Sequence, residues 1–455
     1  IMKHMKIQEQ LNIDELRQII LDSSKISTKN PIVRDDYSRW LKKGTENNFI
    51  KVITGFRRVG KSFLLKQLRL FLIEEKKVPV ENILFINFEH DLLANYKKVS
   101  DLRHLFDLFK TEIMQPGPVY LFLDEVQNVK QWEKFVRTIY DSEKEKYNIF
   151  VTGSNSSLLS SEFSTALSGR VIEKEIHSFS FLNYLKFKNI EINNDFDRVE
   201  KQDLLQKNVL EYLKNGGLPE TINQDEEIIR TYIKSLFRKV LIDDILNRFK
   251  IEKFDILEKL FYFIISNVGQ VTSFSKIMGT LASQGEKITI ATLQEYTKMY
   301  DQTFAWNKIS KFDWKNKKIF SKNYKFYSFD NGLLNNLHIS KLDIKEKLLE
   351  NLVFNVLRKK YNNIYYGRDD RNKEIDFIIP QNNKSFLKIQ VTVELHEENK
   401  KRELGNFVLA DKYLKAGQNI IITLNGKRQV HQYKNTEIQE IPLLNLLLKK
   451  ENLDI

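Results

Sequence analysis

The first third of the chain alternates between short apolar runs and longer segments in which apolar residues recur at helical spacing. Four runs rich in β-branched and aromatic residues are predicted to be strands: Lys51–Thr54, Ile83–Phe88, Val119–Leu123 and Ile149–Thr152. Strands that are apolar along their whole length and separated by helices are typical of a parallel sheet covered on both faces. The pattern therefore predicts an α/β fold, preceded by helical sequence over residues 6–45.

The middle of the chain is predominantly helical. One break at Asn215–Pro219 divides the helical segment of residues 178–248, because its two glycines and its proline must end a helix. Three further helices are predicted at Leu257–Ile265, Ser273–Met278 and Ile290–Tyr300. A β-rich segment, Trp306–Phe329, follows them, and this order favours a winged helix-turn-helix.

The last section, residues 343–455, returns to an α/β pattern. Its predicted strands are Ile375–Ile379, Phe386–Val393 and Asn419–Thr423.

The first predicted strand leads directly into a glycine-rich loop and a helix. The loop residues are Gly55, Phe56, Arg57, Arg58, Val59, Gly60, Lys61 and Ser62, with Phe63 opening the apolar face of the helix. This spacing matches G-x-x-x-x-G-K-[ST], in which backbone N–H groups surround the phosphates of a nucleotide. Lys61 would reach the β- and γ-phosphates, and the Ser62 hydroxyl would ligate Mg²⁺. The alternative is a chance turn, which the flanking strand and helix disfavour.

The third predicted strand ends in two acids, Asp124 and Glu125. An acid at the carboxyl edge of a strand beside a phosphate loop is suited to hold Mg²⁺, which is the role predicted for Asp124. Glu125 is predicted to polarise an attacking water as general base, which favours an ATPase over a kinase. A solvated Asp-Glu turn is the alternative.

The fourth strand runs into Ser154 and Asn155, and a helical stretch beyond it ends at Arg170. Asn155, with Ser154 beside it, is predicted to orient the water or contact the γ-phosphate, although both residue types are also common helix N-caps. Arg170 is a candidate arginine finger, acting in cis or from a neighbouring subunit of a homo-oligomer, or alternatively a surface salt-bridge residue.

Composition narrows the choice of partner and compartment. The net charge of +13 favours a polyanionic partner such as nucleic acid, although a generally lysine-rich composition would give the same value. The absence of cysteine excludes disulfides, zinc-thiolate sites and cysteine nucleophiles. No apolar run approaches the roughly 20 residues of a membrane span, and no signal peptide is visible, so a cytoplasmic protein without membrane partners is expected.

Several motifs together resemble one known family. They are Gly55–Ser62, Leu123–Gln127 followed by Trp132, Thr152–Leu159 through Arg170, Tyr212–Glu220 and Lys325–Gly332. The chain resembles the AAA+ superfamily ATPases of archaea and bacteria that carry a C-terminal restriction-endonuclease-like domain of unknown function. This resemblance implies that the nucleotide is ATP, and it supports Lys61, Ser62, Asp124, Glu125 and Asn155 as site residues, with Arg170 as the finger.

The resemblance also implies the domain organisation. The expected parts are an N-terminal helical segment (1–45), an AAA+ P-loop core (46–177), a helical lid (178–250), a winged helix (251–337) and a PD-(D/E)XK-like α/β domain (338–455).

Nucleases of this last fold hold metal with an acid on a first helix, an Asp at a hairpin and Glu-x-Lys on the next strand. Glu350 and Asp376 occupy the first two places, whereas Gln390 and Thr392 replace the Glu and the Lys. An uncharged amide is a weaker ligand for a hard divalent cation. A non-cleaving domain kept for binding or assembly, including to a protein partner, is therefore expected. Glu394, on the same strand face as Gln390, could substitute for it.

The segment between Phe304 and Phe329 is both basic and aromatic. Its lysines are Lys308, Lys311, Lys315, Lys317, Lys318, Lys322 and Lys325. Lys315, Lys317 and Lys318 would form the tip of a wing that contacts DNA phosphates, and Lys298 on the third helix would face a groove. The alternative is a solvated hairpin whose aromatic side chains pack on the core.

The sequence thus predicts a Mg-ATP-hydrolysing AAA+ protein that acts on DNA, in branch processing, repair or defence, with an inactive nuclease-like domain. The alternative is a nucleotide switch with a protein partner and no DNA substrate.

Overall fold

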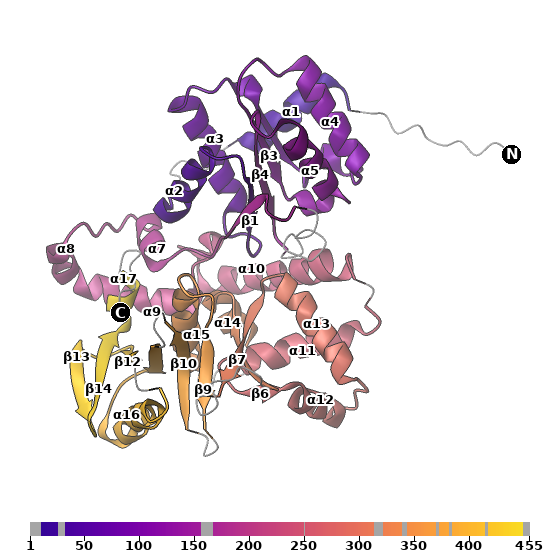
Figure 1. Cartoon of the computed structure of the whole chain (residues 1–455). Helices are drawn as coiled ribbons and strands as arrows, with labels where there is room; N and C mark the ends of the chain where they lie inside the picture. The colour runs from indigo at the N-terminus through magenta and orange to yellow at the C-terminus, as the bar shows by residue number, and fades with distance from the viewer. Residues whose placement is uncertain are drawn as a thin grey trace. The chain divides into compact units, whose positions relative to one another are not determined.

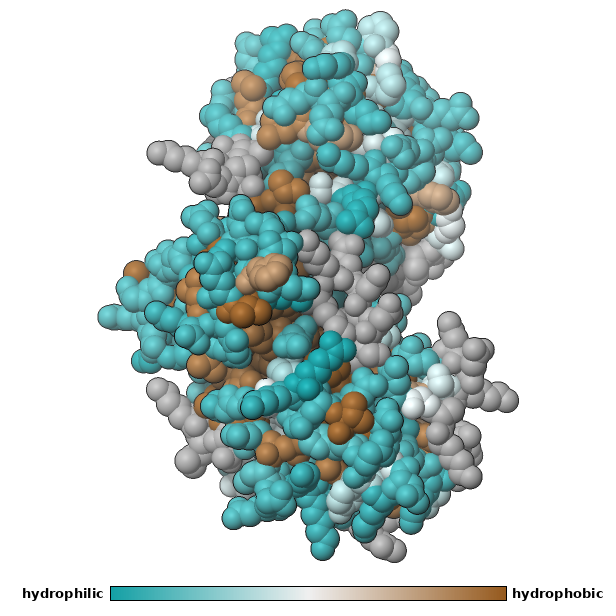
Figure 2. Space-filling view, turned by 90° about the vertical axis from the view of Figure 1, so that its left-hand side faces the viewer, coloured by the Kyte–Doolittle hydropathy of each residue, from teal (hydrophilic) through white to brown (hydrophobic). Residues whose placement is uncertain are grey.

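The computed structural model describes residues 11–25, 32–155, 167–249, 251–313, 322–338, 344–369, 373–381, 385–414 and 417–448. The chain forms two compact units, residues 1–176 and 177–455 (Figure 1). On the face drawn in Figure 2, hydrophilic residues predominate and hydrophobic ones lie in small groups among them. Within the described ranges, no helix combines the length and the apolar character needed to cross a membrane.

The first unit contains a parallel five-stranded sheet in the order β2-β3-β4-β1-β5. Its strands are β1 (Ile50–Thr54), β2 (Ile83–Asn87), β3 (Val119–Asp124), β4 (Tyr147–Gly153) and β5 (Val171–Glu175). The predicted parallel sheet and its first four strands are confirmed. The sequence did not reveal β5, because this edge strand is only partly buried and three of its five residues are charged.

Helices cover both faces of this sheet (Figure 1). They are α1 (Ile13–Ser24), α2 (Asp35–Gly44), α3 (Lys61–Glu74), α4 (Val99–Glu112) and α5 (Trp132–Glu143), with short turns η1 (Val80–Asn82), η2 (Asp91–Leu93) and η3 (Val126–Asn128). Apolar residues of α1, α4 and α5 share one hydrophobic core with the strands. Because Leu16 and Ile19 are fully buried in that core, α1 is an integral part of the first unit rather than a separate segment.

The second unit begins with a helical region. Its elements are α7 (Phe181–Phe187), α8 (Asp195–Glu200), α9 (Gln202–Asn215), η5 (Pro219–Thr221), α10 (Glu226–Lys239) and a π-helical turn, η6 (Val240–Leu246). The predicted break after Asn215 is confirmed, because Gly216 ends α9 with a positive φ of 72°.

A three-helix module follows. It consists of α11 (Phe254–Ser266), β6 (Thr272–Ser273), α12 (Phe274–Ser283), α13 (Ile290–Gln302), β7 (Trp306–Phe312) and β8 (Asn323–Ser328). The predicted helices and β-rich segment are present, and β8 pairs antiparallel with both β6 and β7.

The remaining elements form the C-terminal part. They are α14 (Asn331–Leu337), α15 (Ile344–Leu357), β9 (Tyr365–Arg368), β10 (Glu374–Pro380), β11 (Phe386–Thr392), α16 (Glu397–Asp411), β12 (Gly417–Thr423), β13 (Gln429–Tyr433), β14 (Thr436–Pro442) and α17 (Leu443–Leu448). A nine-stranded sheet runs in the order β13-β14-β12-β11-β10-β9-β7-β8-β6. Lys311 and Phe312 of β7 pair with Tyr366 and Gly367 of β9, so the segments predicted as separate domains share one sheet.

Two motifs that lie far apart in the sequence meet inside the second unit. The Gly217 N–H donates to Asp330 Oδ2 at 3.0 Å, and the Asn331 side chain donates to the Leu213 carbonyl at 2.7 Å. A Cβ added to Gly216 would lie 1.8 Å from Asp330 Oδ1. The glycine is therefore required both by its backbone angles and by the space that Asp330 occupies.

We expect Gly216→Ala to lower the free energy of unfolding by at least about 2 kcal/mol, because it adds backbone strain to a steric overlap. The measurement is urea unfolding followed by tryptophan fluorescence. Gly279→Ala is the control, since Gly279 lies inside α12 with open space around it. That change should stabilise by about 0.5–1 kcal/mol. Equal free energies of unfolding for Gly216→Ala and Gly279→Ala would contradict the conclusion that position 216 requires glycine.

Candidate nucleotide-binding site

The phosphate loop leaves the carboxyl end of the fully buried strand β1. Gly55, the first loop residue, has a φ of 140°, and a Cβ there would lie 2.3 Å from the Ile176 carbonyl oxygen. Gly60, the last loop residue, has a φ of 93° and caps α3. The backbone conformation requires glycine at both positions. The loop leads into the N-terminus of a 14-residue helix, so its N–H groups and the positive end of the helix dipole lie together.

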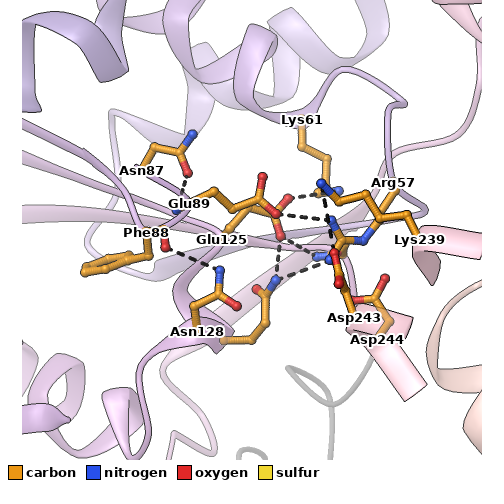
Figure 3. Close-up of polar contacts among 12 residues, drawn as sticks. Arg57, Lys61, Asn87, Phe88, Glu89, Glu125, Asn128, Lys239, Asp243 and Asp244 are labelled. Atoms are coloured by element: carbon orange, nitrogen blue, oxygen red, sulfur yellow. Dashed lines mark hydrogen bonds and ion pairs between the residues drawn. The ribbon is translucent and has the colours of Figure 1, made fainter. Parts of the chain in front are cut away.

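The side chains inside the loop point in two directions. Phe56 and Val59 are fully buried, so these two predicted residues can contact phosphate only through their main chain. Arg57 is directed towards Glu89, with 3.1 Å between Nη1 and Oε1 (Figure 3). Arg58 is exposed and has a positive φ of 65°.

Lys61 is the buried cation of the site. Its ammonium donates to the carbonyls of Gly55 at 3.1 Å and Phe56 at 3.2 Å, and lies 3.5 Å from Glu125 Oε1 (Figure 3). The next residue, Ser62, hydrogen bonds to Asp124. Phe63 is partly buried in the first turn of α3. The loop, the lysine and the acids are thus brought together as the sequence predicts.

Asp124 ends β3 and is completely buried. Burial and, secondarily, the charge of Glu125 raise the pKa of Asp124 from 3.8 to about 6, while Thr152, Ser62 and Lys61 act in the opposite direction. Thr152 donates its hydroxyl to Oδ1, whereas Oδ2 has no hydrogen-bond partner of ordinary geometry in the described part of the chain. A buried carboxylate oxygen beside a serine hydroxyl fits a Mg²⁺ ion, which prefers oxygen ligands.

Glu125 is held in an uncommon backbone conformation, with φ 52° and ψ 44°. Its N–H donates to the Thr152 hydroxyl at 3.0 Å, and its carboxylate accepts hydrogen bonds from the Gln127 amide and, at 3.2 Å, from the Ser154 N–H. Burial favours the neutral acid, but Lys61 and then Gln127 outweigh it and lower the pKa of Glu125 below its ordinary value. Glu125 is therefore ionised at neutral pH.

Sequence reasoning missed Thr152 and Gln127, which orient both acids. For Thr152, the available signal was its hydroxyl group near the end of β4, a mostly apolar strand that pairs with β3. Ser154 and Asn155, which follow β4, are buried, and β4 lies between β3 and β1 in the sheet. Ser154 accepts a hydrogen bond from Gln127 at 3.3 Å.

Arg34, which precedes α2, is a second residue that the sequence did not reveal. It is 3% exposed, and its Nη1 donates to the Val59 carbonyl at 3.0 Å. A buried guanidinium on a loop carbonyl restrains the phosphate loop from outside.

Arg170 lies away from this site. It immediately precedes β5, which pairs in parallel with β1 from its first residue, Ile50. Arg170 therefore stands at the amino edge of the sheet, about 13 Å of strand from the phosphate loop. There it binds Asp141, with Nε to Oδ1 at 2.8 Å. The prediction that Arg170 reaches the nucleotide in cis is thus wrong.

The predicted DNA-contacting residues have different positions. Lys298 is exposed on α13, whereas Lys315, Lys317 and Lys318 lie outside the described residues. Lys325 belongs to the basic segment of the predicted wing, but it is 1% exposed and therefore lies inside the structure.

Three domain families match successive parts of the chain. Residues 47–185 match an AAA domain, residues 206–347 match a domain of unknown function (DUF8612), and residues 345–444 match another (DUF4143).

Two relatives extend this match to most of the chain. An uncharacterised protein of Haemophilus influenzae is 32% identical over 419 residues, covering 92% of this chain and 98% of the relative. An uncharacterised protein of Methanocaldococcus jannaschii is 34% identical over 404 residues, covering 88% of this chain and 86% of the relative. The chain belongs to this family of AAA-domain proteins.

The AAA-domain match includes the phosphate loop, both acids and the end of β4, whereas Arg34 precedes it. The matched part of the chain is an AAA-type, P-loop ATPase domain. Among solved structures, a Walker-type ATPase of Pyrococcus abyssi is 15% identical with a TM-score of 0.41, over 69% of this chain and 99% of that one. A likeness at this level carries no weight beside the family match.

The raised pKa of Asp124 predicts a pH-dependent cost to the stability of the AAA domain. Because the folded state holds this proton up to about pH 6 and the unfolded state only to about 3.8, stability is lost as pH rises between these values. We expect the free energy of unfolding of Asp124→Asn to exceed that of the wild type by up to about 3 kcal/mol above pH 7 and by little below pH 4. The measurement is urea unfolding without nucleotide.

The exposed Asp107 of α4 provides the control for this experiment. Asp107→Asn should show no such pH-dependent gain. A difference between Asp124→Asn and the wild type that is constant with pH would contradict the assignment.

Proposed function

We propose that the protein binds and hydrolyses Mg-ATP, using the Glu125 carboxylate as general base. The observation that carries the proposal is the position of the Glu125 carboxylate, which is buried, lies 3.5 Å from Lys61 and accepts hydrogen bonds from Gln127 and Ser154. Lys61 and these donors lower its pKa, which favours the ionised form. A fixed, ionised carboxylate beside a phosphate loop can take a proton from water.

Each residue has a separate task in this proposal. The loop N–H groups and the end of α3 bind the phosphates, and Lys61 moves its ammonium from the loop carbonyls to the β- and γ-oxygens. Ser62 and Asp124 hold Mg²⁺, which neutralises charge on the phosphates when bound. Glu125 accepts the proton of the attacking water, and Asn155 orients that water. ATP rather than GTP is supported by the family resemblance.

Glu125→Gln should reduce steady-state ATP hydrolysis by about 10²–10⁴-fold while nucleotide binding is retained, because the amide cannot accept the proton. Phosphate release and fluorescent-nucleotide binding are the two measurements. Glu112→Gln, an exposed acid at the end of α4, is the matched control and should behave as the wild type. Hydrolysis by Glu125→Gln at the control rate would rule out this general base.

We further propose that the protein binds DNA and uses ATP hydrolysis to act on it, in branch processing, repair or defence. The order α11-β6-α12-α13-β7-β8 with its antiparallel pairing is typical of a winged helix, and Lys298 is exposed on the third helix. The net charge of +13 supports a polyanionic partner.

If α13 contacts DNA, duplex or branched DNA should stimulate ATP hydrolysis, and Lys298→Ala should weaken the stimulation equally for all sequences. In a plot of log DNA affinity against log salt concentration, the steepness of the slope should decrease by about 0.9, as expected for one lost phosphate contact. Lys134→Ala, exposed on α5, is the control. An unchanged slope for Lys298→Ala would remove α13 from the DNA interface.

A nucleotide switch with a protein partner is the second candidate. Phe196 of α8 is 86% exposed and Val199 of the same helix is 73% exposed, which is unusual for apolar residues of this size. Turnover that is indifferent to every DNA would favour this candidate.

The C-terminal part is proposed to be a non-cleaving, PD-(D/E)XK-like domain retained for binding or assembly. The order α15, β9, β10, β11, α16 and β12, with β11 parallel to β12, supports the fold. Gln390 and Thr392 support the loss of activity, since neither supplies the charge of the residue it replaces. Arg170 is proposed to act on the nucleotide of a neighbouring subunit, which would require a homo-oligomer.

A further inference from the structure

A lysine lies among the acids at the place where the nuclease-like fold would hold a metal ion. Lys325 reaches this place from β8, which belongs to the three-helix module. Its Nζ lies 2.9 Å from Glu350 Oε1, 2.7 Å from Glu374 Oε1 and 3.4 Å from Asp376 Oδ1. One ammonium therefore contacts three carboxylates from two different elements, α15 and β10.

Neighbouring residues complete the enclosure of this ammonium. The Lys325 side chain is 1% exposed, and Tyr327, on the same face of β8, donates its hydroxyl to Glu350 Oε1 at 2.6 Å. Gly269, with a φ of 74°, leaves room for the second oxygen of Glu350, which lies 2.8 Å from the place of a Cβ. Substituting a larger residue at Gly269 would displace Glu350 from the lysine.

The charges in the cluster depend on one another. Burial and then Glu350 raise the pKa of Asp376, whereas Lys325 acts to lower it. Burial alone would lower the pKa of Lys325, but Glu350 and the other neighbouring acids raise it well above its ordinary value. The lysine is therefore charged, and it supplies positive charge to the buried Asp376 and to the partly exposed Glu350 and Glu374.

These acids have no place for a divalent metal ion while Lys325 lies between them. Asp376 Oδ2 already accepts the Val391 N–H at 2.9 Å, and Gln390 Oε1 accepts the Asp376 N–H at 3.4 Å. In the parts of the chain that the structure describes, no three His, Cys, Asp or Glu side chains are arranged to hold a metal. The central position between the acids is filled by the Lys325 ammonium.

We propose that Lys325 is the resident cation of this site, taking the place of a divalent metal and joining the three-helix module to the C-terminal part. Glu350 and Asp376, which occupy the places of the metal-binding acids of this fold, then serve with Glu374 as a binding site for a side chain of the same protein. This role does not depend on ATP hydrolysis. Among the proposals above, it depends only on the comparison with a nuclease fold, and it gives that fold a structural function that needs no metal ion.

The experiment measures thermal unfolding with Mn²⁺ or EDTA, and Mn²⁺ binding by electron paramagnetic resonance. All variants carry Asp124→Asn, so that the nucleotide site contributes no metal binding. The parent should neither bind Mn²⁺ at this cluster nor change its Tm with Mn²⁺ or EDTA. Adding Lys325→Met should lower Tm by about 10 °C, because the buried Asp376 and the partly buried Glu350 and Glu374 lose their shared partner.

Two further variants separate this role from ordinary packing. Lys322→Met, an exposed lysine beside β8, is the matched control and should keep the parent Tm. The triple variant Lys325→Met/Glu350→Gln/Asp376→Asn neutralises two of the three acids. It should recover most of the decrease in Tm caused by Lys325→Met. Added Mn²⁺ should raise the Tm of Lys325→Met but not that of the triple variant.

Four results would overturn the proposal. They are a parent that binds Mn²⁺ and loses this binding with Asp376→Asn, a Lys325→Met variant as stable as Lys322→Met, and a Lys325→Met variant that Mn²⁺ does not stabilise. The fourth is Mn²⁺-dependent DNA cleavage that Lys325→Met abolishes, which would make Lys325 a catalytic lysine. If Lys325→Met does not fold, recovery of folding by the triple variant still decides the question.

Discussion

The nucleotide site is organised around a positive charge removed from water. The Lys61 ammonium shares its hydrogen bonds between two loop carbonyls and lies next to the Glu125 carboxylate, so the loop, α3 and the end of β3 are held to a common point. Removing such a cation leaves buried acids without compensation, which costs more than the pair itself contributes. The low pKa of Glu125 follows from this arrangement, because Lys61 is the neighbour that lowers it most.

The local parts of this site could be predicted from the sequence because its motif is a continuous strand, loop and helix. The spacing of Gly55, Gly60 and Lys61 determines how the loop meets the helix, and the apolar strand before Asp124 determines where that acid emerges. Thr152 and Arg34 could not be assigned in this way. Their contacts depend on which strands are neighbours and on how α2 packs, and neither is written in a short pattern.

The same distinction explains why the positions of Arg170 and Lys325 could not be predicted from the sequence. Arg170 precedes a charged edge strand that the pattern did not reveal, and the direction of that strand decides at which edge of the sheet the arginine stands. Lys325 lies in a lysine-rich segment, so its composition suggested a solvated ribbon. Residues on both faces of β8 are buried, however, and alternation along a strand gives no sign of which lysine points inwards when both faces are covered.

The connection between the two units begins at the phosphate loop itself. The Ile176 N–H donates to the Thr54 carbonyl at 2.8 Å, and the Ile176 carbonyl occupies the space beside Gly55 that a side chain would need. Ile176 is also the last residue of the first unit. The chain thus leaves the first unit while still hydrogen bonded to the strand that carries the loop. The backbone that limits the space around Gly55 therefore continues directly into the second unit, through main-chain atoms alone.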